Sequence, residues 1–399
     1  MTTANAELFT PAFQADPHPV YARLRAEEPV HRVTLPGGNL AWLVTRYDDA
    51  RQALSDPRLA KGGLLTPTGP NAFMDPAVIA AMSTHMLTAD PPDHTRLRRL
   101  VSAAFTHRRV ELLRPRVEEI TAGLLDAMAG RDEVDLIDAF AFPLPIQVIC
   151  ELLGVPAEDR DSFREWSDTI VAGVMSGDRL PWAFASMLAY LREMLARKRA
   201  EPADDLVSAL ISVREEGDAL TENELTSTVF LLLIAGHETT VNLLGNAVHV
   251  LLSRRERWEA LRADPELLPS AIEEFLRYES PVETATFRVA VADVELGGTT
   301  IPAGDAVLIG LLAGNRDDRR FAAAGEFDPA RGDNAHLAFG HGIHYCLGAP
   351  LARLEARIAL GALLARFGDL RLAVEPQELL WRPGVLMRGL VGLPVTGLG

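Results

Sequence analysis

One long apolar helical segment constrains the fold of this 399-residue chain more than any other feature. Thr221 and Glu224 have the spacing of a capping box, in which the Thr hydroxyl and the Glu carboxylate each accept a hydrogen bond from an amide at the helix start. The helical pattern continues to residue 253, which at ~1.5 Å per residue makes roughly 50 Å, enough to cross a domain of this size. Its first half is apolar on most faces, so we expect this helix, residues 221–253, to be a buried central element.

The middle of this helix carries residues that suit a buried helix poorly. Residues 235–240 read Ala-Gly-His-Glu-Thr-Thr. Glycine and the β-branched threonines have low helix propensity, and a buried carboxylate costs several kcal/mol unless it is paired or hydrated. Several local rules broken together in one buried element indicate a functional site.

The rest of the chain is mostly helical, with short strands. Residues 41–46 and 283–310 contain strand-like runs, whereas residues 92–280 are mainly helical. No repeat or linker divides the chain, so we expect one domain over residues 1–399, mainly α with small β-sheets. The Gly- and Pro-rich segment 58–88 is expected to be irregular. It is either a loop folded over the core or a lid over an apolar ligand.

Composition restricts the location and the partners of the protein. Two cysteines, Cys150 and Cys346, are too few for a disulfide framework, which fits a reducing cytoplasm. No signal segment is visible at the N-terminus, and the longest purely apolar run falls far short of the ~20 residues that span a bilayer. A net charge of −16 disfavours general binding of nucleic acids. We therefore expect a soluble, cytoplasmic protein that binds neither nucleic acid nor membrane.

A second unusual segment, residues 337–348, contains a glycine-rich loop and Cys346 (FGHGIHYCLG). Cys346 lies where a helix begins, and the helix dipole there favours the thiolate. One interpretation of Cys346 is a buried structural cysteine, as we expect of Cys150. That interpretation does not explain the glycine-rich loop. A zinc site with His341 and His344 lacks a fourth ligand, and a cysteine nucleophile lacks a base and an oxyanion hole. An axial thiolate ligand of a haem iron needs only one protein ligand.

These segments resemble the signature motifs of the cytochrome P-450 monooxygenases. FGHGIHYCLG resembles their haem-binding signature, and AGHETT resembles the oxygen-activation motif of their long central helix. Glu274 and Arg277 match the Glu-x-x-Arg element, with Arg331 as its third member, and DPPDHTRLRRLV resembles the helix at the haem edge. The resemblance covers essentially the whole chain and is nearest to the soluble actinobacterial branch that oxidises macrolides, other polyketides and sterol-like molecules. It implies a single triangular haem-thiolate domain that binds haem b and uses O2.

The resemblance also implies roles for individual residues. Cys346 would ligate the iron, and Thr239 and Glu238 would deliver protons to the reacting oxygen, next to the carbonyl of Ala235. Glu274, Arg277 and Arg331 would be structural. The residues expected to hold the haem are His94, Arg98, Arg288, Phe339, Gly340, His344, Cys346 and Gly348. The residues expected to face the substrate are Leu87, Val174, Leu232, Ala235, Val282, Ala285, Phe287 and Met387.

The implied reaction inserts one oxygen atom of O2 into a hydrophobic small molecule, by hydroxylation or epoxidation. Electrons would come from NAD(P)H through a ferredoxin reductase and a ferredoxin, and the protein would act as a monomer. The arginines of residues 94–109 form a local basic region in an acidic chain, where we expect the ferredoxin to dock. Two alternatives remain. One is a peroxygenase that uses hydrogen peroxide, against which the Glu238–Thr239 pair argues, and the other is a non-catalytic haem- or lipophile-binding protein.

Overall fold

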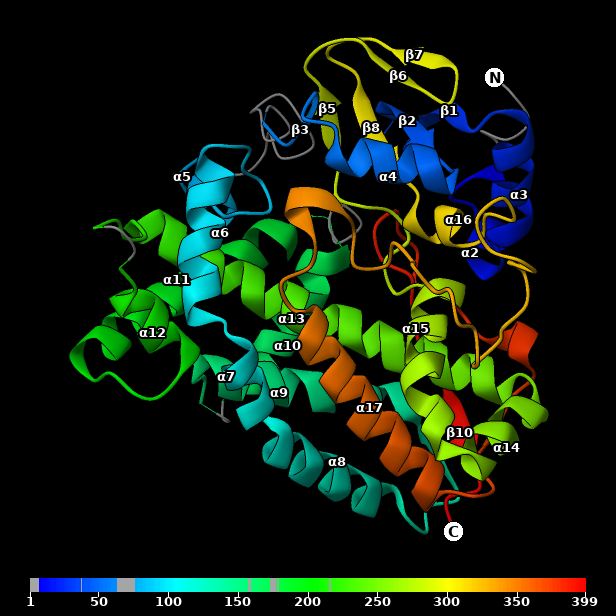
Figure 1. The fold of residues 1–399 in the computed structure, drawn as a ribbon. Helices are drawn as coiled ribbons and strands as arrows, with labels where there is room; N and C mark the ends of the chain where they lie inside the picture. The colour runs from blue at the N-terminus through cyan, green and yellow to red at the C-terminus, as the bar shows by residue number, and fades with distance from the viewer. Residues whose placement is uncertain are drawn as a thin grey trace. The chain divides into compact units, whose positions relative to one another are not determined.

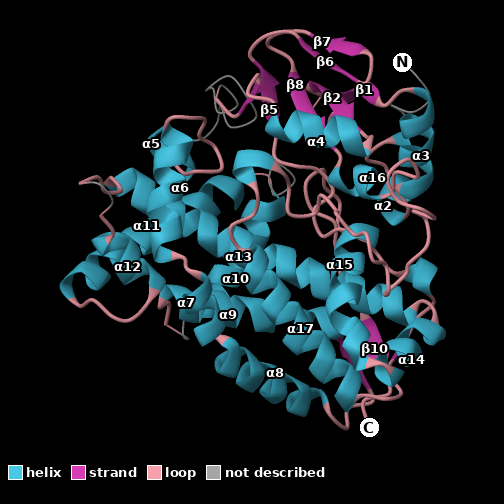
Figure 2. Cartoon of the chain, in the orientation of Figure 1, coloured by secondary structure: helices cyan, strands magenta, loops and turns pink. Residues whose placement is uncertain are grey.

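The computed structural model describes residues 7–36, 38–62, 76–156, 159–172, 177, 179–214 and 217–399. The chain forms two compact units, of which the first comprises residues 1–60, 117–144 and 239–399 and the second residues 61–116 and 145–238. The ribbon is mainly helical with small sheets (Figure 1, Figure 2), which confirms the predicted fold class. One functional domain over residues 1–399 stays a prediction.

The first unit combines helices with all the strands of the described residues. Its helices are α2 (Pro11–Ala15), α3 (His18–Glu27), α4 (Tyr47–Ser55), α14 (Arg255–Ala263), α15 (Leu268–Tyr278), α16 (Leu311–Asn315) and α17 (Ala349–Arg366), with a π-helix at Ile137–Ala141 and 3-10 helices at Pro265–Leu267, Gly342–His344 and Pro376–Glu378. Its strands are β1 (Val30–Thr34), β2 (Leu40–Val44), β3 (Leu59–Ala60), β4 (Glu133–Asp135), β5 (Arg288–Ala290), β6 (Val294–Leu296), β7 (Thr299–Ile301), β8 (Ala306–Ile309), β9 (Arg371–Leu372) and β10 (Pro394–Thr396).

The largest sheet has the strand order β1-β2-β8-β5-β3, and only the β2–β8 pairing is parallel. Strands β4, β10 and β9 form a second sheet, and β6 and β7 form a hairpin. Gly297 and Gly298 connect the two hairpin strands and both have positive φ, +54° and +80°. A two-residue hairpin loop of this kind needs positive φ at both positions, which glycine adopts without steric cost.

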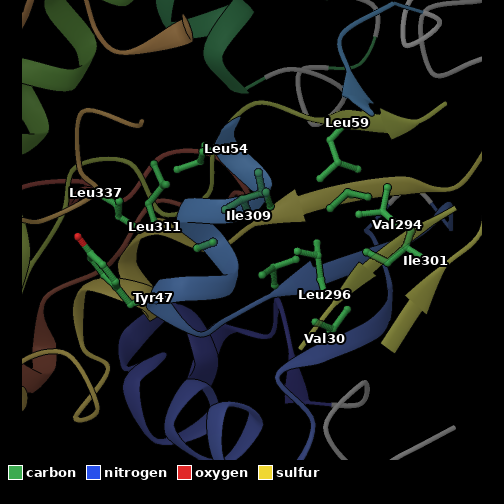
Figure 3. Packing of buried hydrophobic residues seen from close by; sticks show 14 of the residues in the cluster. Val30, Tyr47, Leu54, Leu59, Val294, Leu296, Ile301, Ile309, Leu311 and Leu337 are labelled. Carbon is green, nitrogen blue, oxygen red and sulfur yellow. The ribbon is translucent and has the colours of Figure 1, made fainter. Parts of the chain in front are cut away.

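Buried apolar side chains of α4, the large sheet and the hairpin pack into one core cluster (Figure 3). Val30, Leu54, Leu59, Ile301 and Ile309 are each at most 3% exposed. This cluster joins the end of α4 to the large sheet. Because such a core is close-packed, the loops that follow α4 and β5 start from fixed positions.

The second unit contains α5 (Pro76–Ser83), α6 (Asp93–Ala104), α7 (His107–Leu112), α10 (Arg160–Ala172), α11 (Arg179–Ala200) and α12 (Leu206–Ser212). In this unit α11 contacts α5, α10 and α12, and α12 contacts α6. Three further helices, α8 (Arg114–Met128), α9 (Pro143–Leu153) and α13 (Glu222–Leu252), begin in one unit and end in the other.

Helix α13 confirms the predicted long helix to within one residue at each end. The expected capping box is present, because the Thr221 amide donates to Glu224 Oε2 (2.8 Å) and the Glu224 amide donates to Thr221 Oγ1 (3.4 Å). Among the described residues, α13 alone is long and apolar enough to cross a membrane. However, 67% of its most apolar window is buried within the protein, as in a core helix.

The segment 58–88 is less irregular than the sequence suggested. It contains β3 and, at residues 76–83, helix α5, whereas residues 63–75 lie outside the described residues. The helix follows from local chemistry, because Pro76 occupies its first turn, where a missing amide hydrogen costs nothing, and no glycine interrupts PAVIAAMS. The packed loop and the lid both stay predictions for this segment.

Candidate functional site

The middle of α13 has one accessible face. Ala235 is exposed and Leu232 and Thr239 are half-buried, whereas His237 and Glu238 are each 1% exposed. Positions 232, 235 and 239 recur at helical spacing and therefore share a face. Leu232, Ala235 and Thr239, which we expect to contact substrate and reacting oxygen, are therefore among the accessible residues in this part of α13.

Two of the unusual residues in α13 are explained by packing in the second unit. A side chain at Gly236 would bring a Cβ within 2.8 Å of Ile149 Cδ1, so the glycine allows α9 to approach closely. His237 uses both ring nitrogens, because Nδ1 lies 2.7 Å from the Leu233 carbonyl oxygen and Nε2 lies 2.9 Å from Ser167 Oγ. Glu238 remains a deeply buried carboxyl, with Oε1 3.5 Å from His237 Nε2.

The loop around Cys346 is built on glycines in the first unit. Gly340 and Gly342 both have φ of +74°, and a Cβ at Gly342 would lie 3.0 Å from the carbonyl oxygen of Leu54 at the end of α4. The Cys346 amide donates to the carbonyl oxygen of Phe339 (2.9 Å), which closes the loop. Cys346 is exposed and lies three residues before α17 begins, whereas Cys150 is fully buried in an apolar helix. The sequence predicted the burial of Cys150 and the position of Cys346 before a helix, and the structure adds that Cys346 is exposed.

Arg288 approaches the same end of α4. Arg288 is 4% exposed, and its guanidinium donates to the carbonyl oxygens of Leu59 (3.0 Å) and Leu54 (3.2 Å). Leu54 also contacts the Cys346 loop through Gly342, so Arg288 and this loop share a support. His344 is half-buried in the same loop, whereas His94 and Arg98 lie one turn apart on α6, in the second unit.

Glu274, Arg277 and Arg331 are in contact, as expected. Glu274 and Arg277 are completely buried and form a two-bond ion pair, with both N–O distances 2.7 Å, and Arg331 Nε donates to the same carboxylate at 3.1 Å. Arg277 also donates to three backbone carbonyls, of residues 315, 324 and 326. A buried pair with this many hydrogen bonds fixes the backbone between residues 315 and 331.

The segments expected to line the substrate region are joined by backbone hydrogen bonds. Val282 and Met387 form an antiparallel bridge, and the Ala285 amide donates to the carbonyl oxygen of Ile309 (2.8 Å). Phe287 is half-buried and packs against a second core cluster, which includes Phe13, Tyr21 and Leu43. The structure therefore places four of the eight expected residues, Val282, Ala285, Phe287 and Met387, in one region of the first unit. Leu87, Leu232 and Ala235 belong to the second unit, and Val174 lies outside the described residues.

One buried carboxyl in this region was missed by sequence reasoning. Glu283 is fully buried, and Tyr21 donates its hydroxyl hydrogen to Oε1 (2.5 Å). Burial raises the pKa of Glu283 to about 7, against the opposing effect of the Arg388 charge. The sequence did contain a signal for this carboxyl, because Glu283 is the single charged residue in the segment PVETATF.

The basic region of residues 94–109 is partly neutralised by acidic residues of the second unit. Arg96 forms ion pairs with Glu224 and with Asp218 (3.2 Å to Oδ2). Arg109 lies 3.9 Å from Asp204. These acids are more than 90 residues away in the sequence, so only the fold of the second unit brings them to the arginines. Arg99 and Arg108 are exposed.

This arrangement defines a class of site. One exposed thiol stands at the start of a helix, in a glycine-shaped loop, with a buried guanidinium supported at the same place. A soft sulfur donor suits iron, and a buried arginine suits a carboxylate such as a haem propionate. The residues of the first unit therefore fit a haem-thiolate centre.

Comparisons with known proteins identify the family. A family model described as Cytochrome P-450 matches residues 183–387. The chain is 54% identical to cytochrome P-450 107B1 of Saccharopolyspora erythraea, over 97% of this chain and 96% of that protein. It is 49% identical to the vitamin D(3) 25-hydroxylase of Pseudonocardia autotrophica, over 99% and 97%. Among solved structures, the tirandamycin C-bound monooxygenase TamI aligns with a TM-score of 0.90 and 51% identity, over 97% of this chain and 99% of that one.

The chain belongs to the cytochrome P-450 family. It is an oxidoreductase that incorporates oxygen from O2, and haem b is the cofactor of this family. The relatives place it among bacterial monooxygenases and hydroxylases.

Proposed function

We propose that this protein inserts one oxygen atom of O2 into a lipophilic substrate such as a macrolide, a polyketide or a sterol-like molecule. The other oxygen atom leaves as water, and NAD(P)H supplies two electrons through a ferredoxin reductase and a ferredoxin. The observation that carries this proposal is the exposed Cys346 in its glycine loop at the start of α17. The TamI and vitamin D(3) 25-hydroxylase likenesses support a bulky hydrophobic substrate. We further propose a soluble, cytoplasmic monomer that acts without membrane or nucleic acid.

The residues take the following roles. Bound haem supplies the redox chemistry that activates O2. Cys346 Sγ would hold the iron, in the loop that contains Phe339, Gly340 and Gly348, and Arg288 and His344 would bind the propionates, a role that the family resemblance also assigns to His94 and Arg98. The residues that would face the substrate and exclude water from it are those that the resemblance assigns: Leu87, Val174, Leu232, Ala235, Val282, Ala285, Phe287 and Met387.

In this proposal α13 would deliver protons to the reacting oxygen. Thr239 Oγ1 would hold a proton-bearing water, Glu238 would pass protons to it, and the Ala235 carbonyl would orient the water. A peroxygenase needs less proton delivery, because hydrogen peroxide already carries two protons. Product formation from NAD(P)H and O2 with surrogate redox partners, compared with product from hydrogen peroxide alone, separates the two functions.

The reduced, CO-bound protein tests the assignment of Cys346. We expect the red-shifted Soret band of a thiolate-ligated haem in the wild type and in Cys150→Ala, and its loss in Cys346→Ala, because alanine offers no ligand. Cys150 is the matched control, since it is the other cysteine and is completely buried. An unchanged band in Cys346→Ala would end the proposal.

A spectral titration tests the substrate class. Vitamin D3 and tirandamycin C serve as probes, and displacement of the iron-bound water is scored from the Soret shift. Consumption of NAD(P)H that rises with either probe, together with an oxygenated product, distinguishes an enzyme from a non-catalytic lipophile-binding protein.

A further inference from the structure

A polar cluster in the first unit connects α15 and α17 to the loop that carries Cys346. Arg353 of α17 forms a two-bond ion pair with Glu273 of α15, with Nε–Oε1 and Nη2–Oε2 distances both 2.7 Å. The guanidinium carbon of Arg353 lies 4.5 Å from the centre of the Phe339 ring. A planar guanidinium held by a carboxylate at its edge can stack on an aromatic ring with its face, which a lysine ammonium cannot do.

His336 completes the cluster in one defined tautomer. Its Nδ1 accepts a hydrogen bond from the Ala338 amide (3.2 Å), so the ring hydrogen lies on Nε2. Nε2 then donates to Glu273 Oε2 (3.1 Å). Burial alone would raise the pKa of Glu273, but the hydrogen bonds from Arg353 and His336 outweigh it and lower the pKa to about 2. Glu273 is therefore ionised at every pH at which the enzyme works.

The cluster acts on the cysteine through Phe339. The ring of Phe339 is contacted by Arg353, and the His336 and Tyr345 rings lie 5.8 and 6.3 Å from it, centre to centre. The carbonyl oxygen of the same residue accepts the hydrogen bond from the Cys346 amide (2.9 Å). The position of Phe339 thus determines the position of the backbone that carries the sulfur.

This cluster is separate from the neighbouring Glu274. That carboxylate binds Arg277 and Arg331 and faces the segment 315–331, whereas Glu273 binds Arg353 and His336. Two adjacent glutamates of α15 therefore hold two different parts of the chain. The side chains of Arg353 and Glu273 are also 35% and 28% exposed, so their ion pair is in contact with solvent.

We propose that Glu273, Arg353 and His336 are positioning residues for the haem thiolate, which hold Phe339 and, through its carbonyl, the backbone of Cys346. The proposal rests on Cys346 as the iron ligand. Residues that orient a metal ligand without touching the metal commonly change metal binding when they are removed. No proton or electron moves through the cluster in this role.

The variants Arg353→Ala, Arg353→Lys and Glu273→Gln test the proposal. Arg357→Ala is the matched control, because Arg357 is exposed and lies one turn further along α17. Each haem-loaded protein is reduced with dithionite, which needs no protein donor, and saturated with CO. The measurements are the rate at which the thiolate Soret band converts to the non-thiolate form on mild heating, and the midpoint reduction potential of the haem.

We expect Arg353→Ala to accelerate the conversion roughly tenfold and to shift the potential, and Glu273→Gln to do the same more weakly. Arg353→Lys should fall between wild type and Arg353→Ala, because lysine keeps a single bond to Glu273 but loses the stacking on Phe339. If Arg353→Ala does not retain haem, the comparison is made with Arg353→Lys and Glu273→Gln, whose helical circular dichroism reports folding. The double variant Glu273→Gln/Arg353→Ala should convert no faster than Arg353→Ala, because both changes remove one interaction.

Conversion rates and potentials equal to those of Arg357→Ala in all these variants would overturn the proposal. Slower reduction by a ferredoxin with an unchanged spectrum would also overturn it, since Arg353 would then be part of a donor surface only. Failure of the Cys346→Ala test would instead be seen as a thiolate band that survives without Cys346, so the two outcomes are distinguishable.

Discussion

Thr239 and Glu238 are neighbours on α13 but differ in their surroundings. Glu238 is 1% exposed, whereas Thr239 lies on the accessible face with Ala235 and Leu232. This difference suits a proton relay in which the accessible Thr239 hydroxyl contacts the reacting oxygen and the buried Glu238 carboxyl supplies protons to that hydroxyl. The sequence motif supplied both residues, and the structure adds which of them is accessible.

Thr239→Ala should uncouple the reaction. Substrate should still bind and NAD(P)H should still be consumed, but the ratio of product to NAD(P)H should fall by roughly tenfold or more, with hydrogen peroxide released. Glu238→Gln should instead slow turnover. The ratio is measured with a substrate found in the titration, and a wild-type ratio in Thr239→Ala would assign the water to another group, such as Thr240.

Glu283 should make stability depend on pH. Its pKa of about 7 in the folded protein exceeds the value of about 4.3 for an exposed glutamate, so the folded state binds the proton more tightly. The stability contributed by the protonated form is complete below about pH 4.3 and is lost as pH rises through about 7, up to ~4 kcal/mol in total.

Glu283→Gln retains an oxygen acceptor for Tyr21 and does not titrate. The melting temperature of this variant minus that of the wild type should therefore be larger at pH 8 than at pH 5. Differential scanning calorimetry at both pH values measures the gain, and a difference in melting temperature that does not change with pH would contradict the assigned protonation.

At the level of elements, the Cys346 loop depends on its contact with the end of α4. Gly340 and Gly342 have the same φ of +74°, but their surroundings differ. A Cβ at Gly342 would press on backbone atoms of Leu54 and Ser55 at 3.0 and 3.3 Å, whereas the nearest atom at Gly340 is 3.8 Å away.

Gly340→Ala and Gly342→Ala therefore form a matched pair. Strain from positive φ should cost each about 1–2 kcal/mol, and the backbone clash should add to that cost only in Gly342→Ala. We expect Gly342→Ala to unfold at a lower denaturant concentration and to retain less haem than Gly340→Ala. Equal denaturant midpoints would mean that the end of α4 shifts to accommodate the added methyl group.

At the scale of the whole molecule, the electrostatic prediction changes once the fold is known. Arg96 forms ion pairs with Glu224 and Asp218, so its charge is neutralised within the second unit. Arg108, in contrast, is exposed. A donor surface is better tested at Arg108 than at Arg96.

Arg108→Glu should slow reduction by ferredoxin while leaving dithionite reduction and the melting temperature unchanged. Added salt should slow the wild type in the same assay, because exposed charges are screened within about 8–10 Å. Arg96→Glu should lower the melting temperature through like-charge repulsion at Glu224. Unaltered ferredoxin kinetics in Arg108→Glu would remove this arginine from the donor surface.

The sequence by itself determined the features that depend on neighbouring residues. The capping box at Thr221 and Glu224, the length of α13 and the glycine loop before Cys346 follow from short-range geometry, and each lies where the pattern predicted it. The pairing of Glu274 with Arg277 is equally local, since the two residues lie one turn apart on α15.

Only the tertiary structure decided what distant segments do to one another. It paired Arg96 with Asp218, it placed Tyr21 on Glu283 across more than 260 residues, and it joined Glu273 to Arg353 beside Phe339. It also gave Gly236 a packing role against Ile149 that the sequence had attributed to a site. Burial and charge pairing are set by side chains brought together from far along the chain, and a local pattern contains no information about those neighbours.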